Sequence, residues 1–456
     1  VESPKRVMSQ WLINRFSDYA KRPFLATVEK TYSYSDLSSA VASDFDSLRK
    51  QGIRAGEVVT LQADYSLQGI STLFALFKLK AVVAPIACAS DEETRRKQIE
   101  SRAKWNIDTK NDERQCTSLP CELPPYSLVE KLSKRDHPGL ILFSSGSTGK
   151  PKAMVHDLCH LLDPFSRKRP RKHCILIFLL FDHIGGLNTL FNGLASGAKI
   201  VVPQSRDATV VAEAIQKHKV NLLPASPTFL NLLLISGALL TYDLSSLRFV
   251  TYGTETMPES LLLRLKTALP NLALIQTFGT SETGISQTTS RSSGSTQMKI
   301  DDPNTEYKIV DHELWLRSKS QILGYLNHSM SRFTEDGWFK TGDLVEESTD
   351  GFLTIIGRRE DMINVGGEKV TPTEIESVLL ELPEIVDCLV YGESNAITGQ
   401  NVAAEIVARC TDDLKSLKRM IKRHCRQVLS PYKVPARIIF SEQTAVSDRF
   451  KKKRIK

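Results

Sequence analysis

The middle of the chain alternates short apolar runs with amphipathic stretches of helical length. The apolar runs have the length of buried strands and lie at residues 139–145, 174–181, 199–203, 221–226, 247–253 and 272–279. The stretches with helical spacing lie at residues 188–195, 212–219 and 258–269. Strands that alternate with helices in this way are typical of βαβ units, so we predict mostly parallel sheets covered by helices.

The pattern changes near residue 357. Short strands with turn signals precede this point, at residues 306–318 and 351–357. Beyond it we predict a compact α+β unit, whose first helix begins at Pro372 with Thr371 as its N-cap. Its other predicted elements are strands at residues 384–392, 402–410 and 434–440 and a helix at residues 412–429. We therefore predict a large domain over residues 1–358 and a small one over residues 359–456.

Composition and charge exclude several classes of protein. The chain has 456 residues, 41% hydrophobic and 25% charged, which is typical of globular proteins and not of disordered or fibrous ones. It contains no run of about 18 apolar residues, so we predict no membrane-spanning helix. The net charge of +8 comes mainly from two short basic runs, residues 167–172 and 451–456, which argues against a nucleic-acid-binding face.

The cysteines and the first residues bear on the compartment. The eight cysteines form no CxxC pair and no Cys/His pattern at zinc spacing. Several lie in apolar segments, where a reduced cysteine behaves as a small hydrophobic residue. The first residues lack the apolar region of a secretory signal. We therefore predict a cytoplasmic protein with reduced thiols.

The segment SSGSTGKPK, residues 144–152, follows a predicted strand and is the most specific local signal. The backbone N–H groups, hydroxyls and lysines of such a loop can bind phosphate oxygens. It differs from a Walker loop because Ser144 replaces the first glycine and Pro151 follows Lys150. A flexible Gly/Ser turn is the alternative interpretation of this segment alone.

Further motifs follow in the order YGTETMP (residues 252–258), TFGTSETG (277–284), ELWLRS (313–318), WFKTGDL (338–344) and GRREDMINVGGEKVTPTEIE (357–376). With SSGSTGKPK and a basic terminal segment, this series resembles the successive motifs of the adenylate-forming superfamily, which includes acyl- and aryl-CoA ligases, carrier-protein adenylation domains and luciferases. The resemblance implies an α/β fold. A large N-terminal domain would hold layered mixed and parallel sheets with helices and a small β-barrel-like subdomain. A small α+β C-terminal domain would rotate against it.

The resemblance also implies a two-step reaction. A carboxylate attacks the α-phosphate of ATP, which gives an acyl-adenylate and pyrophosphate, and a thiol then displaces AMP. The implied cofactors are ATP, Mg²⁺ and CoA, or the phosphopantetheine of a carrier protein. Negative charge builds up on the phosphates in the first step, so the protein must supply aimed donors and a metal ion.

The residues that match the family's catalytic positions are Lys451, Thr148, Glu282 and His183. Glu282, together with Thr148, is the implied ligand of magnesium, for which oxygen ligands are suited. His183 aligns with a histidine that borders the acyl pocket of acyl- and aryl-CoA ligases. Two lysines follow Lys451 directly, so the register of the catalytic lysine is open within residues 451–453.

The other matching positions are implied to bind the nucleotide and the thiol. Those implied to hold the phosphates are Ser144, Ser145, Gly146, Ser147, Thr148, Gly149 and Lys152. Those implied to surround the adenine and the α-phosphate are Gly253, Thr254, Glu255, Thr256, Phe278, Gly279, Thr280 and Ser281. Asp343, with Arg358, is implied to bind the ribose, since one carboxylate can accept two hydroxyl donors. Gly366 and Gly367 are implied to line the pantetheine tunnel, and Glu360 to be the hinge between the domains.

The segment FLLFDHIGGLN, residues 178–188, resembles acyl- and aryl-CoA ligases more closely than amino-acid-activating domains. In the latter an aspartate of this segment holds the substrate ammonium, whereas Asp182 lies one position before His183 and on its other side. Apolar stretches at residues 186–191 and 226–234 favour a hydrophobic pocket for a fatty or aryl acid.

The thiol acceptor is left open by the sequence. The basic residues 167–172 suit the phosphates of CoA and also the acidic helix of an acyl carrier protein. We therefore consider a CoA ligase first and a stand-alone enzyme that loads a carrier protein second. A binding protein without turnover is a third interpretation, which is disfavoured by the intact set Thr148, Glu282, Asp343 and Arg358.

Overall fold

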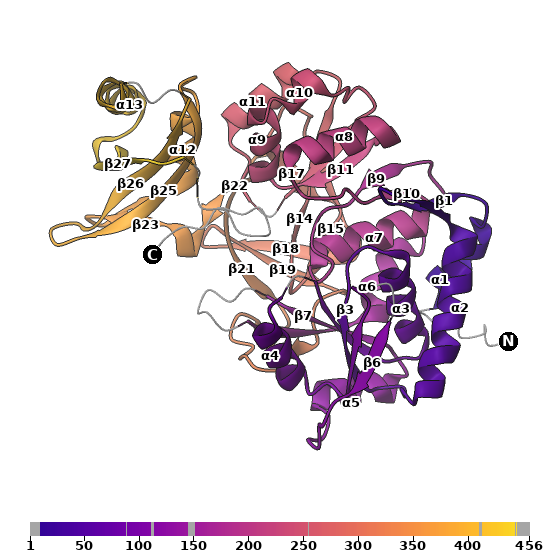
Figure 1. Cartoon of the computed structure of the whole chain (residues 1–456). Coiled ribbons are helices and arrows are strands. Elements are labelled where there is room, and N and C mark those ends of the chain that lie inside the picture. Colours follow the sequence, from indigo (N-terminus) through magenta and orange to yellow (C-terminus); the bar gives the residue numbers. More distant parts are fainter. Residues whose placement is uncertain are drawn as a thin grey trace.

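The computed structural model describes residues 10–87, 89–110, 114–144, 151–253, 255–409, 413–442 and 444. Figure 1 shows a large body of sheets and helices, with the small part formed by the residues after 358 set to one side of it. Among the described residues, no helix has both the length and the apolar content needed to cross a membrane. The sheets described below confirm the predicted α/β architecture.

One seven-stranded sheet of the large body has the strand order β13-β12-β11-β9-β10-β1-β2. Its strands are β1 (Pro23–Ala26), β2 (Thr31–Ser33), β9 (Cys174–Leu176), β10 (Lys199–Val201), β11 (Leu222–Ala225), β12 (Phe249–Tyr252) and β13 (Ala273–Gln276). All neighbours are parallel except β1 and β2, as the βαβ pattern predicts.

A second seven-stranded sheet has the order β20-β8-β7-β4-β3-β5-β6. Its strands are β3 (Val58–Gln62), β4 (Val82–Ile86), β5 (Trp105–Asp108), β6 (Gln115–Ser118), β7 (Gly139–Phe143), β8 (Ala153–Asp157) and β20 (Gly324–Tyr325). The four central strands are parallel, and antiparallel strands flank them on both sides.

Helices cover these sheets and also lie between them. They are α1 (Gln10–Asp18), α2 (Tyr34–Gln51), α3 (Leu67–Lys78), α4 (Asp91–Ser101), α5 (Ser127–Arg135), α6 (Leu158–Leu162), α7 (Ile184–Ser196), α8 (Ala208–His218), α9 (Pro227–Ile235), α10 (Ala238–Thr241) and α11 (Glu259–Ala268). Helix α3 is buried at every residue from Gly69 to Phe77. One apolar core includes α3, α7 and strands of both sheets, so these two helices fill the space between the sheets.

A six-stranded antiparallel sheet takes the place of the predicted β-barrel-like subdomain, in the order β16-β17-β22-β21-β19-β18. Its strands are β16 (Thr288–Ser290), β17 (Gln297–Ile300), β18 (Thr305–Val310), β19 (Glu313–Ser318), β21 (Phe339–Glu347) and β22 (Leu353–Arg358). The ribbon of β14 (Phe278–Thr280) and β15 (Gly284–Ser286) precedes it in the chain.

The small part has its own five-stranded sheet and its own apolar core. The strands are β23 (Ile363–Val365), β24 (Glu368–Val370), β25 (Ile385–Asn395), β26 (Gly399–Ala408) and β27 (Arg437–Phe440), and the helices are α12 (Pro372–Leu379) and α13 (Leu414–Val428). Helix α12 begins at Pro372 with Thr371 as the N-cap residue, as predicted. Among the described residues, this sheet contains no strand from before Arg358.

One predicted strand is mostly wrong. The apolar run at residues 174–181 forms a strand only over Cys174–Leu176, and residues 177–183 adopt neither helix nor strand. Phe178 and Phe181 are nevertheless buried, at 4% and 0% exposure. The run is apolar because it crosses the core as an irregular segment, and a hydrophobic pattern alone does not distinguish this from a strand.

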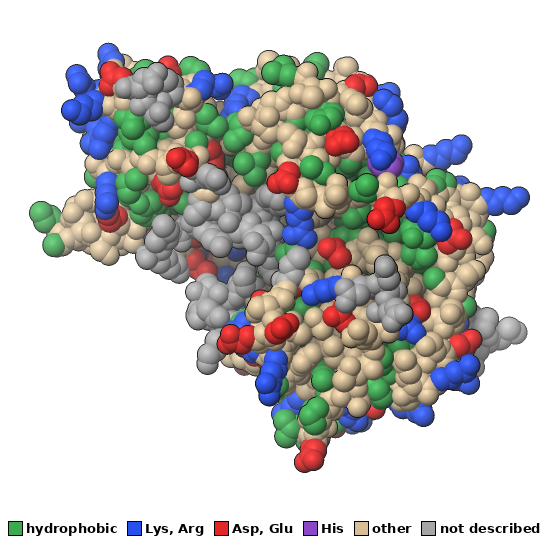
Figure 2. Space-filling model, viewed as in Figure 1, with side chains coloured by type: hydrophobic (Ala, Val, Ile, Leu, Met, Phe, Trp, Pro, Cys, Tyr) green, Lys and Arg blue, Asp and Glu red, His purple; other side chains and the backbone are tan. Residues whose placement is uncertain are grey.

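Charge is distributed differently from the sequence prediction. Figure 2 shows acidic and basic side chains interspersed over most of the visible face, with lysine and arginine gathered at the corner that α13 occupies in Figure 1. The sequence of α13, LKSLKRMIKRHCRQV, contains six Lys and Arg residues and no acidic one. Its apolar side, with Leu417, Ile421 and Cys425 buried, packs on the small sheet. The positive excess is therefore shared with α13 and is not confined to the two predicted runs.

Candidate functional site

A cavity of about 320 Å³ lies where the large and small parts of the chain meet. The predicted nucleotide-binding residues that line it are Gly253, Glu255, Thr256, Phe278, Gly279, Asp343 and Arg358. The opposite wall is formed by residues of the small part, namely Thr371, Pro372, Thr373, Glu376, Leu380 and Asp387. Residues from motifs that are far apart in the sequence thus line one cavity.

The first wall of this cavity is built by the ends of two neighbouring strands. β12 and β13 are parallel, so Gly253 and Thr277 follow them at the same edge of the sheet. A Cβ atom on Gly253 would lie 2.6 Å from the carbonyl oxygen of Thr277, so a residue with a side chain does not fit there. Phe278 is 6% exposed, and its side chain belongs to the apolar cluster of the six-stranded sheet while lining the cavity.

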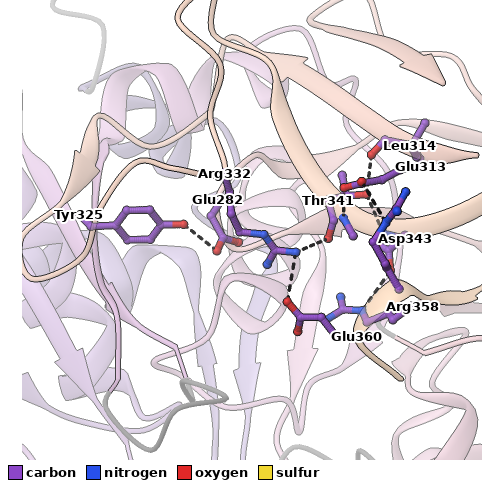
Figure 3. A network of polar contacts seen from close by, with 11 residues as sticks. Glu282, Glu313, Leu314, Tyr325, Arg332, Thr341, Asp343, Arg358 and Glu360 are labelled. Atoms are coloured by element: carbon purple, nitrogen blue, oxygen red, sulfur yellow. Dashed lines mark hydrogen bonds and ion pairs between the residues drawn. The ribbon is translucent and has the colours of Figure 1, made fainter. Parts of the chain in front are cut away.

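Asp343 and Arg358 form an ion pair on this wall. Arg358 Nε donates to Asp343 Oδ1 at 3.0 Å, as Figure 3 shows. The backbone N–H of Asp343 donates to Thr341 Oγ1 at 3.0 Å, and Thr341 Oγ1 donates to the carbonyl of Leu314 at 2.6 Å. Asp343 is 6% exposed, and its negative charge raises the pKa of Arg358. The carboxylate is thus oriented by its own strand and by its neighbours.

Glu255 is held in place from the N-terminus of α9. Thr228 Oγ1 donates to Glu255 Oε2 at 2.7 Å, and both residues line the cavity. Asn231, one turn further along α9, donates from Nδ2 to the carbonyl of Val386 at 3.3 Å. Helix α9 therefore contributes to the wall of the site and also contacts the small part of the chain.

Glu282 lies in a second cluster, and the structure pairs it with a residue that the sequence did not indicate. Tyr325 Oη donates to Glu282 Oε1 at 3.0 Å (Figure 3). Burial and the charge of Glu282 raise the pKa of Tyr325, so the phenol stays protonated and acts as a donor. Tyr325 lies on β20, which pairs with β8 directly after the predicted phosphate-binding loop. One oxygen of Glu282 is thereby fixed beside the strand that follows that loop.

The surroundings of Glu282 are rich in positive charge. Lys152 Nζ lies 5.8 Å from the centre of the Tyr325 ring, and the His328 ring packs edge-on against the same tyrosine. Desolvation and the charges of Lys152 and Arg332 lower the pKa of His328, so its imidazole is neutral at pH 7. Such a set of cations beside one carboxylate suits a polyphosphate with a divalent metal ion.

Arg332 connects the surroundings of Glu282 with the predicted hinge. Its NH2 group donates to the carbonyl of Thr341 at 3.2 Å and lies 3.7 Å from Glu360 Oε1 (Figure 3). Glu360 belongs to the short 3₁₀ turn Arg359–Asp361, which follows β22 immediately. The hinge position is therefore tied by charge to the strand that bears Asp343.

Several predicted residues lie elsewhere or outside the described residues. The described residues exclude Ser145, Gly146, Ser147, Thr148, Gly149, Thr254 and Lys451. The ends of the predicted phosphate-binding loop do meet, because the N–H of Ser144 donates to the carbonyl of Lys152 at 3.0 Å. The cavity lining does not include His183, Gly366, Gly367, Thr280 or Ser281.

His183 and the two glycines have clear local roles. His183 is the N-cap of α7, and its Nδ1 accepts from the N–H of Gly185 at 3.2 Å. Gly366 and Gly367 form the turn between β23 and β24, with φ values of +61° and +95°. A Cβ atom on Gly367 would have no atom within 4 Å, so the space beside it is open in this arrangement of the chain.

Sequence reasoning missed Tyr325, Arg332 and Thr228. Each of these residues acts through a contact with a distant residue, such as Tyr325 with Glu282, 43 positions away. The tyrosine is brought to Glu282 by the pairing of β20 with β8, which local pattern does not predict. Arg332 precedes the WFKTGDL motif by a few positions, and this nearness was the one available signal.

Family models and curated proteins match most of the chain. The family described as AMP-binding enzyme matches residues 14–326, and its C-terminal domain family matches residues 374–449. The indoleacetate–CoA ligase of Aromatoleum aromaticum is 26% identical over 490 residues, with 96% of this chain and 94% of that protein covered. The 2-succinylbenzoate–CoA ligase of Bacillus licheniformis is 29% identical over 341 residues, with 70% and 69% covered.

Solved structures show the same fold. An anthranilate CoA ligase in complex with anthranoyl-AMP has a TM-score of 0.81 at 22% identity, with 98% of this chain and 95% of that chain covered. The o-succinylbenzoate CoA synthetase of Bacillus subtilis, in complex with its acyl-adenylate intermediate, has a TM-score of 0.75 at 21% identity, with 97% and 96% covered.

Proposed function

Because the chain belongs to the AMP-binding enzyme family and is an AMP-forming ligase of the adenylate-forming superfamily, we propose that it activates an apolar carboxylic acid and transfers the acyl group to CoA. In the first step a carboxylate oxygen attacks the α-phosphorus of ATP, and the bond to pyrophosphate breaks. In the second step the thiolate of CoA attacks the acyl carbon of the adenylate, and AMP leaves. The proposal rests on the cavity that is lined by the Asp343–Arg358 pair and by Gly253, the residue that follows β12.

The nucleotide roles follow from the geometry of this cavity. Asp343 accepts hydrogen bonds from the ribose hydroxyls, and Arg358 keeps the carboxylate oriented through its 3.0 Å hydrogen bond. Gly253 leaves room for the adenine at the end of β12, and Phe278 covers it. Lys451 is proposed to bridge the substrate carboxylate and the α-phosphate with its mobile charge.

Glu282 is proposed to hold Mg²⁺ together with Thr148. The fit rests on a carboxylate that Tyr325 orients at 3.0 Å and that lies beside the cations Lys152 and Arg332. When bound there with the phosphates of ATP, the metal ion would neutralise charge on the departing pyrophosphate. The protein's own part is to fix the carboxylate and to aim its donors at the phosphates.

The substrate is proposed to be an aryl acid or a fatty acid. Two observations argue against an amino acid. The carboxylate of Asp182 is buried and lies 3.7 Å from Lys97 Nζ, so it is paired with a lysine of the protein. The Phe178 ring, four positions before Asp182, packs at a tilt against the Phe229 ring of α9 with ring centres 4.3 Å apart, so these surroundings are apolar. The names of the similar proteins, such as indoleacetate–CoA ligase and 2-succinylbenzoate–CoA ligase, support the aryl alternative.

The two domains, residues 1–358 and 359–456, are proposed to rotate about Glu360 between the two steps. In the present arrangement α12 and its neighbours close the nucleotide cavity, and the Gly366–Gly367 turn does not line it. Entry of pantetheine past these glycines would require a second arrangement, in which their turn faces the site. The ion pair of Arg332 with Glu360 would break or re-form in this rotation.

The proposed activity is tested by mass spectrometry of the products. The protein is incubated with ATP, Mg²⁺ and a panel of acids, with either CoA or a phosphopantetheinylated carrier protein as acceptor. We expect an acyl-CoA and AMP from at least one aryl or fatty acid. Acylation of the carrier protein with no acyl-CoA would reject the CoA acceptor and keep adenylation. Absence of both products and of AMP would reject the proposed function.

A further inference from the structure

Lys97 is a buried lysine that joins three segments of the large domain. Its side chain, on α4, is 6% exposed, and Nζ lies 2.9 Å from Oε1 of Glu93 on the same helix. Nζ lies 3.7 Å from Oδ2 of Asp182, in the segment that leads into α7. It also lies 5.8 Å from the ring centre of Phe143, the last residue of β7. A charge so far from water is retained only where opposite charge compensates it.

Asp182 depends on this lysine. The residue is 8% exposed, and its Oδ1 atom has no hydrogen-bond partner among the described residues. Within the described part of the chain, Lys97 is the one cation at ion-pair distance from Asp182. A buried carboxylate with a single compensating cation is attracted to it strongly, because little water screens the pair. The position of Asp182 is therefore set by Lys97.

The segment that contains Asp182 is buried in the core but lacks regular secondary structure. Residues 177–183 form neither helix nor strand, so no ladder of backbone hydrogen bonds fixes them. The Tyr65 ring meets the Phe181 ring edge-on, with ring centres 5.2 Å apart. Gly186 passes so close to Tyr65 that a Cβ atom there would lie 2.4 Å from Oη. The segment is thus held between Tyr65 and Lys97.

We propose that Lys97 is a positioning residue, which fixes His183 through the ion pair with Asp182. The inference rests on the proposed function, and on the sequence prediction that His183 borders the acid pocket and that β7 leads into the phosphate-binding loop. Since Lys97 touches both the end of β7 and Asp182, it sets the separation between the acid and the phosphates. A misplacement of roughly 1 Å between reacting groups lowers catalysis by about 10²-fold.

The test compares Lys97→Met with a matched loss of another buried ion pair. Arg114→Met is the control, because Arg114 pairs with Asp44 at 11% and 14% side-chain exposure, and neither residue belongs to the segment that contains Asp182 and His183. In ATP–pyrophosphate exchange we expect Lys97→Met to lower kcat/KM for the acid by about 10- to 10²-fold, mainly through a raised KM for the acid. KM for ATP should stay within about twofold. Arg114→Met should lower the melting temperature and leave KM for the acid unchanged.

The double variant Lys97→Met/Asp182→Leu separates positioning from simple charge compensation. Replacing both charges removes the uncompensated carboxylate, so the melting temperature should return toward that of the wild type. If KM for the acid also returns to the wild-type value, the pair only compensates charge and the proposal is wrong. If KM stays raised while stability recovers, the pair positions the segment.

Hydrogen exchange provides a readout that does not depend on activity. We expect peptides covering residues 177–188 to exchange faster in Lys97→Met than in the wild type, and unchanged in Arg114→Met. Equal exchange in Lys97→Met and the wild type would overturn the positioning role. If the wild type shows no ATP–pyrophosphate exchange with any acid, the proposed function fails. The hydrogen exchange of residues 177–188 still decides whether Lys97 positions this segment.

Discussion

Asp343 and Arg358 stand directly opposite each other on the antiparallel strands β21 and β22, and Arg358 Nε donates to Asp343 Oδ1 across 3.0 Å. This strand register brings the carboxylate of one motif to the guanidinium of another at the wall of the cavity. β22 ends at Arg358, and the chain turns there toward the small domain. The proposed ribose site and the proposed hinge therefore lie on one pair of strands and the turn that follows it.

Replacing Asp343 tests the ribose site. Asp343→Asn keeps the size of the side chain and removes its charge, so we expect AMP to bind about 10- to 10²-fold more weakly, as for the loss of hydrogen bonds to a charged group. Isothermal titration calorimetry with AMP measures this change. Glu346→Gln, at an exposed position on the same strand, is the control and should bind AMP normally. Unchanged affinity in Asp343→Asn would contradict the assignment.

Replacing Glu282 tests the proposed metal ligand. We expect Glu282→Gln to lower the rate of ATP–pyrophosphate exchange by about 10²- to 10³-fold and to raise the Mg²⁺ concentration for half-maximal rate. Tyr325→Phe removes only the hydrogen bond to Glu282, so its loss should be about tenfold or less. Tyr307→Phe is the matched control, because Tyr307 donates to the exposed Glu347 at 3.1 Å. An unchanged Mg²⁺ dependence in Glu282→Gln would rule out its role as a ligand.

A bulky residue at Gly367 tests the proposed pantetheine tunnel. We expect Gly367→Leu to spare ATP–pyrophosphate exchange and to block acyl-CoA formation. The residue has φ +95°, so leucine also strains the turn between β23 and β24. Gly237→Leu controls for this strain, since Gly237 has φ +72° and equally open space in the large domain. Equal loss of both half-reactions in Gly367→Leu would contradict the tunnel.

The buried His156 predicts a pH dependence of stability. Burial lowers the pKa of this imidazole, on β8, to about 4, whereas the unfolded chain titrates near 6.5. Between these values the unfolded state binds a proton that the native state does not, so the free energy of unfolding falls as the pH falls from about 6.5 to about 4. The titration of this one imidazole changes the free energy of unfolding by up to roughly 3 kcal/mol. Urea denaturation of wild type and His156→Leu measures it, and identical pH slopes would contradict the prediction.

The regular part of the fold was predictable because local pattern and tertiary environment agree there. Strand β11, helix α11 and strand β13 lie within a few residues of their predicted bounds, and α12 begins at its proline. The run at residues 174–181 was not predictable, because its burial comes from the core it crosses and not from a sheet. A run of hydrophobic residues indicates burial. It indicates the type of secondary structure only through the spacing of those residues.

The site was predictable to the extent that its residues belong to recognisable sequence motifs. Gly253 and Asp343 were chosen from motifs, and the structure places both on one cavity. The pairs Tyr325 with Glu282 and Lys97 with Asp182 were not predictable, because each joins segments that are far apart in the sequence and meet only in the folded chain. A sequence pattern shows which side chain is present, whereas its partner depends on the topology.

The central claim is acid activation through an adenylate, and ATP–pyrophosphate exchange tests it most directly. The wild-type protein is assayed with Mg²⁺ against aryl acids such as indoleacetate and 2-succinylbenzoate, fatty acids of several lengths, and amino acids. We predict Mg²⁺-dependent exchange with an aryl or fatty acid and none with amino acids. Exchange with amino acids alone would contradict the proposed substrate class. No exchange with any acid, from folded protein that binds ATP, would contradict the account as a whole.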